Sequence, residues 1–313
     1  MQRGELTSVT AIASRDLGKA QAAAAQLGIP KAYGSYEELL ADPEIDAIYN
    51  PLPNHLHVPW TAKAAEAGKH VLCEKPISMT VAEAKSLLMV RARTGVVIGE
   101  AFMIRCHPQW LRVRELVEEG GIGEVRSVFG FFSYSNADPA NIRNREETGG
   151  GALYDIGCYC IQAARFGFRQ EPTRVCGLIE RDPAMHTDRL TSALLDFPAG
   201  QAIFTCSTQL VPHQRVQFYG TKGRIEFEIP FNAPPDHATR IFIDQGTDIL
   251  GSGITTETLP VADQYTLQGD AFSRAVLEGT PVPVSLEEGI ANMAVIEAIF
   301  RSAQTGQWET VRT

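Results

Sequence analysis

The sequence lacks the features that mark membrane, secreted and nucleic-acid-binding proteins. No apolar run among the 313 residues is long enough to span a bilayer, and the N-terminus does not resemble a secretory signal. The formal net charge of −9 disfavours binding to nucleic acid or to an anionic membrane surface. We therefore expect a cytoplasmic protein whose partners include neither nucleic acid nor membrane.

Cysteine and histidine are few and scattered, which argues against a metal site. Of the six cysteines only Cys158 and Cys160 lie close together, and their spacing is not that of a zinc knuckle. His55, His57 and His107 fall near predicted loops, where a structural hydrogen bond is the commoner role. We predict no metal, and buried reduced thiols rather than disulfides.

The first third of the chain alternates short strands with helices. Strand-like segments occur at 8–14, 45–49, 70–73 and 96–98. Asp16, Ser35 and Thr80 each precede a helical pattern as N-cap residues, the last two with a glutamate three positions later. This alternation predicts an α/β fold with a parallel, doubly wound sheet. No Gly-x-Gly-x-x-Gly occurs, and the first predicted strand resembles the second strand of a dinucleotide fold.

After about residue 105 the pattern changes to one typical of an α+β domain with an open, mostly antiparallel sheet. Turn signals at 198–200 and 220–223 indicate antiparallel hairpins, and 246–256 is interpreted as a flexible loop. We therefore predict two domains, residues 1–104 and 105–313. The strands and helices expected in the second domain are: strands 125–134, 174–179, 191–196, 202–208, 215–219, 224–228 and 241–244; helices 109–119, 155–166, 265–277 and 286–303.

Polar residues follow three of the predicted parallel strands, at 14–15, 50–57 and 74–76. Ligands bind beyond the carboxyl ends of strands in such sheets. Where an acid would select NAD, this chain has Ser14 and Arg15, with Lys19 one turn later; a hydroxyl and two cations suit a 2′-phosphate. The alternative is a solvated Arg and Lys at a helix start.

Two further segments bring together groups suited to proton transfer. Lys75 lies in the rigid Glu74-Lys75-Pro76 loop after a strand, and Asp155 and Tyr159 are one helical turn apart. A nearby ammonium favours the phenolate of a tyrosine, which makes it an acid/base near neutral pH. The alternatives are a surface lysine and a tyrosine that packs in the core. The glycines at 149–151 indicate either close backbone approach to a ligand or a plain loop.

Over nearly its whole length the chain resembles the glucose–fructose oxidoreductase/inositol dehydrogenase family, in the branch with NADP-dependent D-xylose 1-dehydrogenase and dimeric dihydrodiol dehydrogenase. Tyr159, where many members have His, is the mark of that branch. The motifs that carry the resemblance are Ser14-Arg15-Asp16, Pro53-Asn54-His55-Leu56-His57, Glu74-Lys75-Pro76, Gly99 to Pro108, Gly149 to Tyr159 and Tyr219-Gly-Thr-Lys-Gly223.

The resemblance implies a Rossmann domain, and a sheet domain whose flat face builds a homodimer or homotetramer. It implies hydride transfer between NADP, with NAD as the alternative, and a hydroxyl of a sugar (aldose C1) or a cyclic diol. The implied catalytic residues are Lys75, Asp155 and Tyr159. The expected cofactor-binding residues are Ser14, Arg15, Lys19, Pro51, Leu52, Asn54, His57, Glu74 and Arg105.

The chain departs from the family at its start. Members begin with a strand, a glycine turn and a helix, whereas residues 1–6 here resemble the tail of that helix. We therefore expect an incomplete Rossmann domain, and weak or no NADPH binding by these 313 residues alone. Two other readings are a non-catalytic sensor or co-repressor and a degenerate structural paralogue. The presence of Lys75, Asp155 and Tyr159 argues against both.

Overall fold

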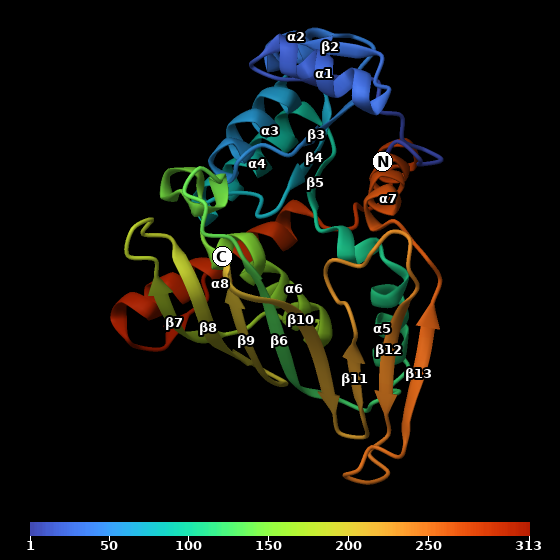
Figure 1. The fold of residues 1–313 in the computed structure, drawn as a ribbon, viewed down its shortest axis with the longest axis vertical. Helices are drawn as coiled ribbons and strands as arrows, with labels where there is room; N and C mark the ends of the chain where they lie inside the picture. Colours follow the sequence, from blue (N-terminus) through green and yellow to red (C-terminus); the bar gives the residue numbers. More distant parts are fainter.

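The chain folds into a smaller part built on parallel strands and a larger part built on one nine-stranded sheet (Figure 1). The computed structural model describes residues 1–313. The strands of the smaller part all lie before residue 102, and the strands of the large sheet all lie after residue 124. This arrangement confirms the predicted combination of an α/β part with a mostly antiparallel α+β part.

The smaller part contains two separate parallel sheets. β1 (Ala11–Ala13) pairs with β2 (Lys31–Tyr33), while β3 (Ala47–Asn50), β4 (His70–Glu74) and β5 (Ile98–Ala101) pair in that order. β1 and β3 do not pair with each other, and no strand lies between them that pairs with both. The parallel sheet is therefore interrupted at this point. The three-residue β2 was not predicted, because it is too short to show an alternating pattern.

Helices connect these strands and begin where the sequence predicts them. Asp16, Ser35 and Thr80 each accept a hydrogen bond from the backbone N–H three residues ahead. Each such cap contributes about 1 kcal/mol, which explains why the helix starts could be located from sequence. The helices are α1 (Leu17–Leu27), α2 (Tyr36–Ala41), α3 (His57–Glu66) and α4 (Val81–Thr94).

The large sheet is antiparallel except for one pair, β6 with β9. Its strand order is β13-β12-β11-β10-β6-β9-β8-β7-β14, and the predicted turns at 198–200 and 220–223 close the β8–β9 and β10–β11 hairpins. The strands are β6 (Val125–Ser135), β7 (Arg174–Arg181), β8 (Asp188–Phe197), β9 (Gly200–Ser207), β10 (Gln209–Gly220), β11 (Arg224–Phe227), β12 (Thr239–Asp244), β13 (Ile254–Leu259) and β14 (Glu309–Thr310).

One edge of the sheet differs from the prediction. The segment interpreted as a flexible loop, 246–256, overlaps β13, which pairs antiparallel with β12 from Ile254 to Leu259. Its sequence is rich in threonine, which favours strands. The glycines before it obscured that signal, so the interpretation as a loop was wrong for residues 254–256.

The hydrophobic core lies between the large sheet and the helices on one of its faces. Trp110 is fully buried there and stacks on Phe227, with 4.4 Å between ring centroids. The opposite face remains open and exposes Leu178 (76%) and Ile203 (49%). The helices of the larger part are α5 (Pro108–Glu118), α6 (Cys158–Phe168), α7 (Gln264–Glu278) and α8 (Leu286–Thr305), and a π-helical turn (Leu153–Gly157) leads into α6.

Hydrogen bonds join the two parts along their junction. The N–H of Val81 donates to Glu297 Oε1 at 2.7 Å, and the N–H of Glu100 donates to the carbonyl of Val284 at 3.0 Å. These contacts hold α4 and β5 against the C-terminal helix region. The carboxyl ends of β3 and β4 consequently face the start of α6.

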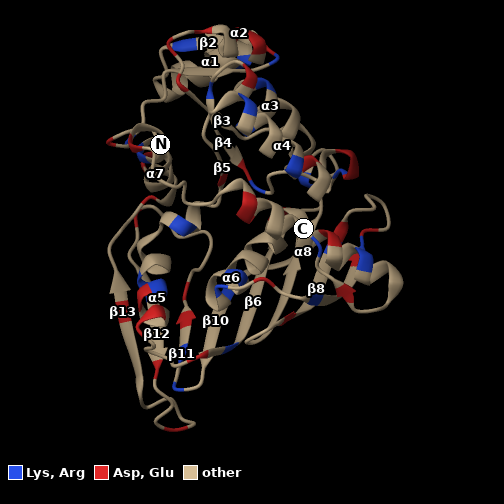
Figure 2. Ribbon diagram, turned by 180° about the vertical axis from the view of Figure 1, so that it is seen from behind, with Lys and Arg blue, Asp and Glu red and all other residues tan.

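Surface charge is mixed rather than segregated by sign. Figure 2 shows acidic and basic residues interspersed over both parts. Exposed ion pairs such as Arg93 with Glu66 contribute little to stability, about 0–1 kcal/mol each. No helix combines the length and apolar character that a membrane crossing requires.

Candidate active site

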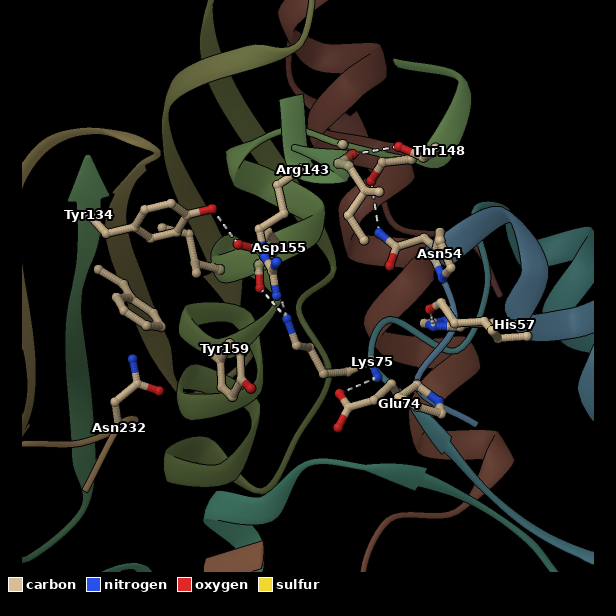
Figure 3. Close-up of a pocket in the computed structure, with 18 of the residues that line it drawn as sticks. Asn54, His57, Glu74, Lys75, Tyr134, Arg143, Thr148, Asp155, Tyr159 and Asn232 are labelled. Atoms are coloured by element: carbon tan, nitrogen blue, oxygen red, sulfur yellow. Dashed lines mark hydrogen bonds and ion pairs between the residues drawn. The ribbon is translucent and has the colours of Figure 1, made fainter. Parts of the chain in front are cut away.

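A pocket of about 420 Å³ lies where the exits of β3 and β4 meet the start of α6 (Figure 3). Figure 3 shows Asn54, His57 and Glu74 on one side of Lys75, and Tyr134 and Asn232 on the other. The pocket thus has a side formed by the parallel-strand part and a side formed by the large sheet.

The loop that carries Lys75 is fixed from beneath by two buried side chains. The Lys75–Pro76 peptide bond is cis. The ring nitrogens of His57 lie 2.7 Å from the Pro76 carbonyl oxygen and 2.6 Å from the Leu52 carbonyl oxygen. Glu100 Oε1 accepts the N–H of Ile77 at 2.7 Å. His57 therefore lies between two loops of the pocket and donates to one of these two carbonyls, because burial lowers its pKa to about 4 and the neutral ring carries one N–H.

Lys75 and Asp155 form the charged centre of the pocket. Lys75 Nζ donates to the Asp155 carbonyl oxygen at 2.5 Å and lies 3.3 Å from Asp155 Oδ1; both side chains are largely buried, with 11% and 13% exposed. Tyr134 donates to Asp155 Oδ2 at 2.6 Å, and Arg143 Nε donates to Oδ1 at 3.2 Å. Three groups thus share the Asp155 carboxylate, which together with the Asp155 carbonyl holds the Lys75 ammonium in place.

The pair keeps both of its members charged. Burial by itself lowers the pKa of Lys75, but the negative charges of Asp155 and Glu74 outweigh it and leave that pKa above its ordinary value. Burial raises the pKa of Asp155, but Lys75 and Arg143 bring it below its ordinary value. Each charge stabilises the other within the site.

Tyr159 is buried beside Lys75, but the two groups meet in an unexpected way. The ammonium lies 4.9 Å from the centroid of the phenol ring, against its face, while the hydroxyl donates only to Met103 Sδ at 3.3 Å. Burial raises the pKa of Tyr159 well above its ordinary value, and the charge of Glu74 adds to the effect. The expected lowering of the Tyr159 pKa by Lys75 is therefore wrong for the structure, because burial and Glu74 favour the protonated phenol.

Five predicted cofactor residues line the same pocket: Pro51, Leu52, Asn54, His57 and Glu74. Glu74 accepts from Tyr49 Oη at 2.5 Å and from the N–H of Lys75 at 3.2 Å. Asn54 Nδ2 donates to the carbonyl oxygen of Gly149 at 2.8 Å, which links the two sides of the pocket.

The other predicted cofactor residues lie elsewhere. Ser14, Arg15 and Lys19 follow β1, at the carboxyl edge of the parallel strands, where the Arg15 and Lys19 side chains are exposed. Arg105 does not line the pocket: its guanidinium donates to Glu288 Oε1 at 2.9 Å in the junction, because the turn 103–106 directs it toward α8. Its cofactor role, which the resemblance implied, stays a prediction.

The glycine triplet is required by contacts within the protein. Gly149 has φ 77°, and a Cβ there would lie 2.8 Å from that of Asn54. A Cβ on Gly150 would lie 2.5 Å from the Arg143 carbonyl oxygen, and one on Gly151, at φ 117°, would overlap the buried carboxyl of Asp188. Close contacts within the protein thus account for the triplet, a reason that neither sequence interpretation gave; Gly149 and Gly150 also line the pocket, so close approach to a ligand stays a prediction.

Among the lining residues that sequence reasoning missed are Tyr49, Tyr134, Arg143, Asn232 and Tyr265. Tyr49 immediately precedes a predicted strand exit and could have been found there. The others come from a long strand, two loops and a helix start, whose convergence depends on the tertiary fold. The structural interpretation of His107 is confirmed, since its Nδ1 accepts the N–H of Gln109 at the start of α5.

Glu100, beneath the Lys75 loop, is a buried carboxyl with only one partner. Its Oε2 has none, and burial raises the pKa of Glu100 to about 8. An unfolded Glu ionises near 4.3. Glu100 therefore makes its full contribution to the free energy of unfolding below that pH. This contribution is lost as the pH rises through about 8.

Glu100→Gln is accordingly expected to flatten the pH dependence of stability. The amide keeps an acceptor for the Ile77 N–H but does not ionise. Urea unfolding should be measured at about pH 5, 7 and 9. The free energy of unfolding of the variant should rise relative to that of the wild type with increasing pH, by a few kcal/mol at most. Glu119→Gln, at an exposed site, is the control. A difference that stays constant with pH would contradict the assignment.

Comparison with known proteins agrees with this architecture. A model described as an oxidoreductase family with an NAD-binding Rossmann fold matches residues 1–102, and a GFO/IDH/MocA C-terminal domain matches residues 110–226. An uncharacterized oxidoreductase of Rhizobium meliloti is 51% identical over 312 residues, covering 99% of this chain and 93% of the relative. D-xylose 1-dehydrogenase (NADP(+)) 2 of Haloferax volcanii is 40% identical over 298 residues, covering 95% and 90%.

Solved structures show the same fold. A 3-ketoreductase from Actinomadura kijaniata, in complex with NADP and TDP-benzene, matches with a TM-score of 0.88 at 30% identity, covering 96% of this chain and 91% of that one. Fold and site together define an oxidoreductase with a nucleotide-binding Rossmann part. The chain belongs to the Gfo/Idh/MocA family of oxidoreductases, which confirms the resemblance seen in the sequence.

Proposed function

We propose that this protein transfers a hydride between NADP and a hydroxyl-bearing carbon of a sugar, at C1 of an aldose, or of a cyclic diol. The observation that carries the proposal is the meeting of Lys75, Asp155 and Tyr159 in one pocket next to the predicted cofactor loop. A relative named as an NADP-dependent D-xylose 1-dehydrogenase supports it.

The residues of the chain divide the proton chemistry among them. Tyr159 donates its phenolic proton to the carbonyl oxygen during reduction, which leaves a phenolate; in the oxidation direction the phenolate takes the hydroxyl proton and the phenol is restored. The Lys75 ammonium stabilises the negative charge that develops on the reacting oxygen, and Asp155 holds Lys75 in place. Bound NADP supplies the hydride acceptor or donor at nicotinamide C4.

The residues present fit the two ends of a dinucleotide. The pocket end has the Pro51–Asn54 loop and Glu74. At the other end, the Arg15 and Lys19 side chains form no hydrogen bond or ion pair within the chain, which leaves their charges available to a phosphate. The interruption between β1 and β3 lies between these ends.

The test of the activity is a substrate panel. NADPH formation is followed by absorbance with D-xylose, D-glucose, D-galactose and trans-cyclohexane-1,2-diol, and in reverse with the corresponding lactones or ketones. Turnover of at least one aldose or diol is expected. A chain that binds NADPH but turns over none of them would favour the non-catalytic sensor instead.

Preference for NADP over NAD is proposed to depend on Arg15, aided by Ser14 and Lys19. A charge-assisted bond to the 2′-phosphate is worth about 1.5–3 kcal/mol. Arg15→Ala should therefore reduce the preference roughly tenfold or more, both in kcat/KM and in the ratio of NADPH to NADH dissociation constants measured by fluorescence. Arg312→Ala, also at an exposed site, is the control. Unchanged ratios would refute this role for Arg15.

The open face of the large sheet supports the proposal of a homodimer or homotetramer. Phe129 on β6 pairs with Ile203 on β9, which pairs with Leu194 on β8, so apolar side chains lie side by side across three strands. With Leu178 they form an apolar area that a second copy of the chain would cover. Six unpaired thiols fit the proposed cytoplasmic setting.

A further inference from the structure

The pocket contains an asparagine whose backbone the protein fixes and whose exposed side chain has no hydrogen-bond partner in the chain. Asn232 follows β11, lines the pocket and makes no side-chain hydrogen bond. Figure 3 shows it on the far side of Tyr159 from His57 and Glu74, away from the predicted cofactor loop. Its amide offers one acceptor and two donors to a molecule that enters from that side.

The loop before Asn232 is anchored by side chains from three elements. Gln214 Oε1, on β10, accepts the N–H groups of both Phe231 and Asn232, at 2.8 and 2.9 Å. Trp110 Nε1, on α5, donates to the Pro230 carbonyl at 2.7 Å. Gln264 Nε2, on α7, donates to the Phe231 carbonyl at 3.0 Å.

Phe231 completes the anchor and connects it to the catalytic tyrosine. Its fully buried ring stacks on Phe132 at 4.8 Å between centroids and packs against Tyr159 at 5.5 Å. The position of the Asn232 backbone is thus set relative to Tyr159 through direct contacts. The backbone of Asn232 is therefore pre-organised, and its exposed amide at the pocket is free to bind a ligand.

We infer that Asn232 binds a substrate hydroxyl other than the one that reacts, and so selects polyhydroxylated sugars over diols on an apolar ring. This inference rests on the proposed function, and deepens it by naming the substrate class. Asn232 is a specificity-determining residue: it takes no part in proton or hydride transfer. The two ends of the substrate would then be held by Tyr159 at the reacting oxygen and by Asn232 at a distant hydroxyl.

The experiment compares Asn232→Ala with the wild type on the best aldose of the panel and on its monodeoxy derivatives. For the parent sugar, KM should rise roughly five- to tenfold, with kcat changed by no more than about twofold. On the one derivative that lacks the hydroxyl in contact with Asn232, the two enzymes should have the same KM. Gln170→Ala removes an exposed amide outside the pocket and should behave as the wild type does.

A structural role is tested separately by thermal unfolding without sugar. Since the Asn232 amide makes no hydrogen bond, Tm should remain that of the wild type. An equal rise in KM on every derivative, or no rise on any, overturns the inference while the proposed function stands. A wild type that turns over none of the aldoses overturns the proposed function, and this inference with it.

Discussion

Tyr159→Phe is expected to lower kcat by about 10²–10⁴-fold, the usual contribution of a positioned proton-transfer group. The substitution removes only the hydroxyl. The ring keeps its edge-on contacts with Phe102 and Phe132, at 5.2 and 5.8 Å between centroids, and the one lost partner is the weak acceptor Met103 Sδ. Folding and NADPH affinity should therefore stay close to those of the wild type.

Steady-state kinetics on the best substrate, together with NADPH titration by fluorescence, measure this effect. Tyr36→Phe is the matched control, because that phenol packs on Trp60 outside the pocket. A variant that keeps most of its kcat would remove Tyr159 from the mechanism and make Asp155 the next candidate. His107 is a poorer one, because it caps α5 and does not line the pocket.

Lys75→Met is expected to lower kcat by a comparable order, about 10²-fold or more. The variant loses the ammonium next to the reacting oxygen and leaves Asp155 with Arg143 and Tyr134 as partners. Since Lys75 and Tyr159 act on the same oxygen, the double variant should lose less than the product of the two single effects. Full multiplicativity would show that the two groups act independently.

Stability must be measured alongside, because a buried carboxylate has lost its cation. Urea unfolding of Lys75→Met should show a loss, since breaking a buried pair costs about 3–5 kcal/mol when no other partner remains, and Arg143 limits that loss here. Lys85→Met, on the exposed face of α4, is the control. Normal turnover in a destabilised Lys75→Met protein would make Lys75 a structural partner of Asp155 alone.

The sequence was informative wherever local chemistry decides the structure. The N-cap residues Asp16, Ser35 and Thr80 predicted where helices start. Lys75 could be predicted as a site residue because it directly follows a parallel strand. The helical spacing of Asp155 and Tyr159 placed both residues beside Lys75, although the first lies in a π-helical turn.

What could not be predicted depends on contacts between distant segments. Arg105 turns toward Glu288 because α8, nearly two hundred positions later, packs there. The raised pKa of Tyr159 follows from burial among aromatic rings of several elements. Asn232 gave no periodic signal, because a loop residue acquires its position only from the side chains that fix it.

The hydrogen bonds that join the two parts have a bearing on evolution and on protein engineering. Tyr154 Oη donates to the Met79 carbonyl at 2.8 Å, Asn54 reaches Gly149, and Lys75 reaches Asp155, so each pair has one member in each part. In each pair the acceptor is a main-chain carbonyl, which every relative of the same fold supplies. A chimera that combines the parallel-strand part of one relative with the sheet part of another therefore keeps these bonds as long as its parents provide the three donor side chains at Asn54, Lys75 and Tyr154.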